Sequence, residues 1–301
     1  MYLEHFGLKT YPFSLTPDTE FFFASPTHRE ALNVLLVALR GGEGFIKVTG
    51  EVGLGKTLLC RQLLNALGDG FVTAYVPNPH LSAASMRLAL ACELGLKRPR
   101  NAYTQQDLLT WLNAALLRLA SHRRQVVLCL DEAQQLPDET LEAVRLLTNL
   151  ETEKRKLLQV VLFGQPELDR RLAERHLRQL KQRITFSYRL APMDRPMMAD
   201  YVAHRLRVAG YRGPSLFSAG ALKRLYKASG GTPRLVNVLC HKSLMAAFGP
   251  GADRVDGRAM RNAIRDTEGV RRRWRFSRAA LAAVVLALVA AGWRWLPGGG
   301  R

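Results

Sequence analysis

Eight consecutive residues have the composition and spacing of a phosphate-binding loop. Glycines at these positions let backbone N–H groups turn inward around phosphate oxygens, while Lys56 can reach the β- and γ-phosphates and the Thr57 hydroxyl can bind Mg²⁺. A glycine-rich turn before an ordinary helix is the competing interpretation. The loop and the residue after it, all predicted to bind nucleotide, are Gly50, Glu51, Val52, Gly53, Leu54, Gly55, Lys56, Thr57 and Leu58.

Two adjacent carboxylates follow an apolar run at residues 126–130. Asp131 can hold the Mg²⁺ shell, and Glu132 can polarise a water molecule for attack on the γ-phosphate. Alternatively, the pair caps the helix that follows, because aspartate favours that position. The two motifs together predict an ATPase that converts ATP and water to ADP and phosphate, with Mg²⁺ as cofactor.

Secondary-structure patterns place both motifs at the ends of strands. A β-type run over 45–49 precedes the glycine loop, and apolar residues at helical spacing follow it. Apolar runs without polar alternation are typical of a parallel sheet covered on both faces. The fold class is therefore α/β, a P-loop NTPase with a parallel sheet flanked by helices and its ligand at the strand carboxyl ends. Further strands are expected over 72–76, 126–130 and 158–163, and helices over about 28–39, 83–94, 106–120 and 137–149.

After about Pro192 the strand signals end and helical spacing continues. Helices over 199–209, 218–229 and 234–248 predict a small helical lid. The predicted domains are an N-terminal arm (1–30), the ATPase core (31–191), the helical lid (192–268), a basic juxtamembrane segment (269–278) and a transmembrane helix (279–296).

Five segments resemble the AAA+ ATPases of the general secretion pathway protein A family and the related pilus-biogenesis and exosortase-locus ATPases. The resemblance covers roughly residues 1–266 and implies a AAA+ ATPase. The segments are Tyr11-Pro12-Phe13, Gly50-Glu51-Val52-Gly53, Asp131-Glu132-Ala133-Gln134, Phe163-Gly164-Gln165-Pro166-Glu167-Leu168 and Gly231-Thr232-Pro233-Arg234-Leu235-Val236-Asn237.

The resemblance implies further site residues. Gln165 is similar to the sensor 1 residue at the γ-phosphate, and Arg234 to the sensor 2 arginine of the lid. Asn78 is a weaker candidate for the residue that restrains the catalytic glutamate. A AAA+ ring also needs an arginine from the neighbouring subunit, for which Arg183 is the first choice and Arg178 the second. A turn cap for Gln165 and a solvated helix face for the arginines are the competing interpretations.

The positive charge is confined to the second part of the chain. The formal net charge is +19; residues 1–170 carry 18 basic and 18 acidic side chains, and residues 171–301 carry 26 and 7, so the excess is 26 − 7 = 19. An anionic partner, either nucleic acid or acidic membrane lipid, would meet this part; a solvated, arginine-rich surface is the alternative. Four dispersed cysteines suggest neither disulfides nor zinc, as expected in the cytoplasm.

A short apolar segment near the C-terminus predicts a membrane anchor. Fifteen uncharged residues lie between Arg278 and Arg294, with Trp274, Trp293 and Trp295 placed as interfacial anchors. The basic residues 271–275 would hold the ATPase at the cytoplasmic face of the inner membrane, attached by this single-pass helix. A helix buried against the domain or an oligomer is the competing interpretation.

Three functions are compatible with these features. The first is a membrane-associated, oligomeric AAA+ ATPase that drives assembly of a cell-envelope secretion, pilus or exopolysaccharide apparatus, with inner-membrane or cell-envelope proteins as partners. The second is a DNA-binding ATPase of the transposition-helper type, which needs no membrane segment. The third is a nucleotide-dependent switch with very little hydrolysis.

Overall fold

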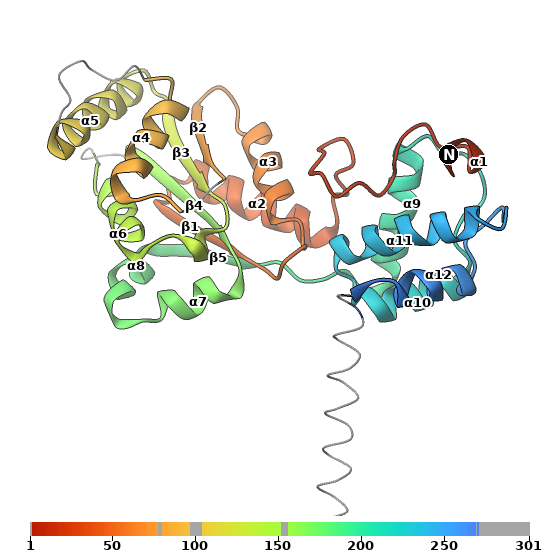
Figure 1. Cartoon of the computed structure of the whole chain (residues 1–301). Helices are drawn as coiled ribbons and strands as arrows, with labels where there is room; N and C mark the ends of the chain where they lie inside the picture. Colours follow the sequence, from red (N-terminus) through yellow and green to blue (C-terminus); the bar gives the residue numbers. More distant parts are fainter. Residues whose placement is uncertain (1, 78–79, 97–103, 152–155, 269, 271–301) are drawn as a thin grey trace, which may run out of the picture. The chain divides into compact units, whose positions relative to one another are not determined.

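The computed structural model describes residues 2–77, 80–96, 104–151, 156–268 and 270 (Figure 1). These residues form two compact units. One unit spans Thr16–Pro192, and the other combines the residues up to Leu15 with those from Met193 onward. The predicted arm is therefore divided between the units at Leu15.

A five-stranded parallel sheet forms the centre of the unit Thr16–Pro192. Its order is β2-β3-β4-β1-β5, and every pairing between neighbours is parallel. This confirms the predicted α/β fold with a parallel sheet. The strands are β1 (Phe45–Thr49), β2 (Phe71–Val76), β3 (Gln125–Leu130), β4 (Leu158–Gly164) and β5 (Ile184–Arg189).

Helices cover both faces of the sheet, as Figure 1 shows. Successive strand residues point to opposite faces, so Val126 packs in a cluster with α4, α5 and α6, whereas Val127 packs in a second cluster with α2 and α3. Both faces of the sheet are thus covered by buried apolar side chains. The helices of this unit are α2 (Pro26–Arg40), α3 (Lys56–Ala66), α4 (Ala83–Glu93), α5 (Gln105–Ser121), α6 (Asp138–Leu147), α7 (Pro166–Leu172) and α8 (Arg178–Arg183), with 3₁₀ turns η1 (Ala133–Gln135) and η2 (Arg175–Leu177).

The second unit is helical. Its residue Arg205 is buried; Nε donates to the carbonyl oxygen of Pro12 at 2.5 Å, which ties the first residues of the chain to α9. Tyr201, on the same helix, donates to Asn237 of α11 at 2.8 Å. The described helices are α1 (Tyr2–His5), α9 (Arg195–Val208), α10 (Ala219–Ser229), α11 (Pro233–Phe248) and α12 (Gly257–Arg265).

The predicted location at the inner membrane, attached by a single-pass helix, is wrong. Among the residues that the structure describes, no helix combines the length and the apolar character that crossing a membrane requires. The predicted helix 279–296 and, except for Val270, the basic segment before it lie outside the described residues.

The side chain of Gln159 links β4 to residues 39 and 43, and replacing it tests how much this contact stabilises the fold. Its side chain is fully buried in β4, and Nε2 donates to the carbonyl oxygens of Leu39 at 3.0 Å and Glu43 at 2.7 Å. We expect Gln159→Leu to lower the free energy of unfolding in urea by about 1–3 kcal/mol, because these carbonyl groups lose their donor. Gln106→Leu, at an exposed position of α5, is the control. Equal stability of Gln159→Leu and the wild type would contradict this role.

Candidate functional site

The glycine loop lies between β1 and α3 and is shaped by backbone geometry that glycine favours. Gly53 and Gly55 have φ angles of +81° and +90°, a left-handed region that other residues adopt at a cost. α3 begins directly after Gly55, so the free N–H groups of its first turn lie beside the loop. This arrangement is suited to binding phosphate oxygens.

Lys56 folds back over the loop. Its Nζ donates to the carbonyl oxygens of Gly50 at 2.7 Å and Glu51 at 3.2 Å, and the side chain is buried. Burial lowers the pKa of Lys56, while the negative charges of Glu132 and Asp131 oppose that change. The ammonium group is thus held at the loop beside two carboxylates.

The two predicted Mg²⁺ ligands are in direct contact. Thr57 Oγ1 donates to Asp131 Oδ2 at 2.6 Å, and Tyr75 Oη donates to the same oxygen at 3.5 Å. A hydroxyl and a carboxylate are hard oxygen ligands, which suit Mg²⁺ when phosphate oxygens complete its shell. Within the described part of the chain no group of three or more His, Cys, Asp or Glu side chains could hold a metal ion without such help. The donor set therefore fits Mg²⁺ bound together with a nucleotide.

Glu132 has an unusual backbone conformation and two amide partners. Its φ angle is +50°, and its backbone N–H donates to Asp131 Oδ1 at 2.9 Å. The carboxylate oxygen Oε2 accepts from Gln134 Nε2 at 2.6 Å and from Gln165 Nε2 at 3.0 Å. Burial raises the pKa of Glu132, but these two hydrogen bonds and the charge of Lys56 outweigh it, so the pKa lies below its usual value. The carboxylate is ionised at neutral pH and can accept a proton.

Gln165 reaches Glu132 because β4 ends beside the carboxyl end of β3. Its own backbone N–H donates to Gln134 Oε1 at 2.9 Å. Gln134 thus bridges Glu132 and Gln165, a role that the sequence analysis missed. The only signal was its place in the segment after Glu132.

α2 supports the loop through His28, which the sequence analysis also missed. The buried imidazole donates from Nε2 to the carbonyl oxygen of Leu54 at 3.0 Å, and Nδ1 lies 2.8 Å from Ser25 Oγ. A Cβ atom at Gly55 would lie 3.1 Å from His28 Nε2. Nothing in the sequence separates this histidine from an ordinary core residue of a helix.

The other predicted residues make none of the hydrogen bonds described above. Arg178 begins α8 and Arg183 ends it, and both are exposed. Arg234 is exposed on α11 in the other unit, and Asn78 lies outside the described residues. Within the unit Thr16–Pro192 the structure therefore brings together the loop, Asp131, Glu132 and Gln165.

Sequence comparison shows two similarities. Residues 39–172 match the model of the AAA domain. General secretion pathway protein A from Aeromonas hydrophila is 41% identical to this chain over 294 residues. The alignment covers 97% of this chain and 53% of that protein, so the chain spans about half the length of this curated relative.

Two solved structures have a similar fold. The ADP form of the Aeropyrum pernix ORC2 protein superposes with a TM-score of 0.63 at 16% identity, covering 85% of this chain and 72% of that one. Cdc6p from Pyrobaculum aerophilum gives a TM-score of 0.61 at 18% identity, covering 79% and 68%. At this level of identity they show the fold alone.

The buried imidazole of His28 makes stability depend on pH. Burial lowers the pKa of His28 below its usual 6.5, so near and below pH 6.5 the unfolded chain takes up a proton that the folded chain excludes. The stabilisation is present above about pH 6.5 and is lost as the pH falls. We expect the free energy of unfolding to decrease less between pH 7.5 and 5.5 in His28→Gln than in the wild type.

Urea unfolding at the two pH values measures this difference. Glutamine can still donate to the Leu54 carbonyl group but does not titrate in this range. His122→Gln, at an exposed position, controls for the replacement of a histidine. Equal pH dependence in the wild type and His28→Gln would contradict a neutral, buried imidazole.

Proposed function

This chain belongs to the AAA+ ATPases related to general secretion pathway protein A, as its motifs predicted, and from that premise we propose that it hydrolyses ATP to drive assembly of a secretion apparatus in the cell envelope. The observation that carries the proposed hydrolysis is the convergence of Lys56, Thr57, Asp131 and Glu132 on one edge of the sheet. The proposed role in secretion rests on the similarity to the secretion protein.

ATP binding is assigned to the glycine loop. The backbone N–H groups of the loop and of the first turn of α3 would bind phosphate oxygens. Lys56 would exchange its bonds to the carbonyl groups of Gly50 and Glu51 for bonds to the β- and γ-phosphates. Thr57 and Asp131 would hold Mg²⁺, which neutralises charge on those phosphates.

Water activation is assigned to Glu132. An ionised carboxylate within reach of the γ-phosphate can accept the proton of an attacking water. Both glutamine amides donate to Oε2, so we assign the water to Oε1. Gln165 would then orient Glu132 and contact the γ-phosphate from the end of β4.

Assembly into a homo-oligomer would complete the site. Charge that develops on the γ-phosphate is stabilised best by a donor placed in advance, and Arg183 is exposed at the end of α8, where a neighbouring subunit can receive it. Arg178 is the second choice for this role, and Arg234 of the helical unit is proposed to contact the nucleotide. The transposition-helper alternative has a similar core and would use the positive charge for phosphate contacts, whereas the relative that aligns with nearly the whole chain is a secretion protein.

Two substitutions separate ATP binding from hydrolysis. We expect Lys56→Ala to abolish ATP binding, because the loop loses its cation. Glu132→Gln should bind ATP normally but hydrolyse it about 10²- to 10⁴-fold more slowly, because the base is lost. Calorimetric titration with ATP and an assay of phosphate release measure both steps. Wild-type turnover in Glu132→Gln would remove Glu132 from its role.

Mixing two inactive variants tests whether Arg183 acts across a subunit boundary. Arg183→Ala keeps its own glycine loop, and Lys56→Ala keeps Arg183, so mixed oligomers contain complete sites. We expect each variant alone to be at least about 10³-fold slower than the wild type, and the equimolar mixture to regain measurable turnover. Arg178→Ala in the same protocol tests the second choice for this role. Wild-type turnover in Arg183→Ala alone would assign the role elsewhere.

A further inference from the structure

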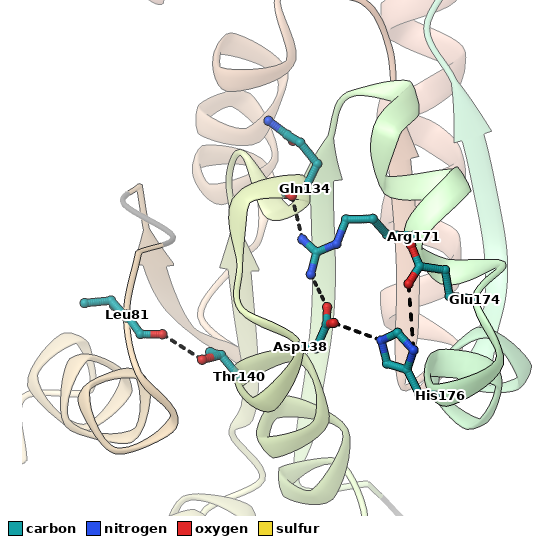
Figure 2. A network of polar contacts seen from close by, with 7 residues as sticks. All are labelled: Leu81, Gln134, Asp138, Thr140, Arg171, Glu174 and His176. Carbon is teal, nitrogen blue, oxygen red and sulfur yellow. Dashed lines mark hydrogen bonds and ion pairs between the residues drawn. The ribbon is translucent and has the colours of Figure 1, made fainter.

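A line of polar contacts leads away from Gln134 across α6 and α7 (Figure 2). Arg171 Nη1 donates to the backbone carbonyl oxygen of Gln134 at 2.6 Å, and Nη2 donates to Asp138 Oδ1. The other carboxylate oxygen of Asp138 lies 2.8 Å from His176 Nε2. His176 Nδ1 is in turn 3.7 Å from Glu174 Oε2.

Arg171 has the charge and shape for two partners at once. Its guanidinium is a planar fork whose donors point in fixed directions, one amino group meeting Gln134 and the other Asp138. Burial raises the pKa of Asp138, but the hydrogen bonds from Arg171 and His176 outweigh it and lower that pKa. Asp138 is therefore a carboxylate, which holds Arg171 by charge as well as by geometry.

Arg171 donates to Gln134, the residue that bridges Glu132 and Gln165. The side chain of Gln134 donates to Glu132 and accepts from the backbone of Gln165, while its backbone carbonyl group accepts from Arg171. Gln134 lies in the 3₁₀ turn η1, directly after the left-handed Glu132. A shift of this turn would change the direction of the Gln134 amide and, with it, the position of the Glu132 carboxylate.

We propose that Arg171 is a positioning residue for ATP hydrolysis, acting through Gln134 to hold Glu132 and Gln165 in place. This inference rests on the proposed ATPase function. The hydrogen bonds of Arg171 are to Gln134 and Asp138, and not to residues of the glycine loop. Its loss therefore slows hydrolysis and leaves ATP binding intact.

Arg171→Met and Arg171→Lys test this role in the full-length chain. Methionine keeps much of the apolar stem without a donor, and we expect kcat to fall about 10- to 100-fold, as for misplaced catalytic groups, with KM and ATP affinity within about twofold. A lysine side chain can donate to one of the two partners, Gln134 or Asp138, so Arg171→Lys should have a higher kcat than Arg171→Met. Arg170→Met is the matched control. The side chain of Arg170 is 78% exposed, and its ion pair is a long surface contact within α7, 3.6 Å from Nη2 to Glu167 Oε1.

A double-mutant cycle distinguishes positioning from simple stabilisation of α7. If Arg171 acts through Gln134, Arg171→Met in a Gln134→Met background should lower kcat no further, so the double variant matches the slower single variant. Independent, multiplicative losses in kcat would overturn the proposal. If Arg171→Met does not fold, the same cycle is run with Arg171→Lys, and a multiplicative result there overturns it equally.

Glu132→Gln, measured in parallel, keeps the two proposals separate. Unchanged turnover in Glu132→Gln would mean that the proposed function of that residue fails, whatever Arg171 does. Loss of turnover in Glu132→Gln with wild-type kcat in Arg171→Met would overturn the role of Arg171 alone. Loss in both, with a cycle that is not multiplicative, supports the inference.

Discussion

The parallel register of the three central strands is the constraint on which the site depends. Thr49 of β1 pairs with Gly164 of β4, and Leu130 of β3 pairs with Leu162. The loop after β1, the carboxylates after β3 and the glutamine after β4 therefore leave the sheet at one edge. The hydrogen bond from Thr57 to Asp131 closes this arrangement. A shift of one residue in any of these strands would turn its apolar side chains to the wrong face.

Residues that carry local signals could be predicted from the sequence. A glycine loop between a strand and a helix, and two carboxylates after an apolar strand, are contiguous patterns, and the structure places them together. The strand β5 was not predicted. It lies at the edge of the sheet and its side chains are largely exposed, so it lacks the apolar run of the other strands. The predicted membrane helix lies outside the described residues, and among the residues that the structure describes no helix could cross a membrane.

Supporting residues could not be predicted, because their roles arise from contacts between distant segments. The side chain of His28 donates to Leu54, 26 positions away, and that of Arg171 donates to Gln134, 37 positions away. A histidine, a glutamine or an arginine in a helix or turn has many ordinary uses. Only the fold shows that these side chains hold the loop and the proposed base. The site thus combines motifs that the sequence reveals with supporting polar side chains that only the structure reveals.

The metal dependence of ATP hydrolysis by the unaltered chain tests the central claim most directly. In this account Lys56, Thr57, Asp131 and Glu132 act together on one nucleotide, and Thr57 with Asp131 supplies the oxygen ligands for Mg²⁺. Phosphate release at saturating ATP should therefore appear with Mg²⁺ and disappear when the metal is chelated. Failure to release phosphate with Mg²⁺ present, at protein concentrations where oligomers form, would contradict the account.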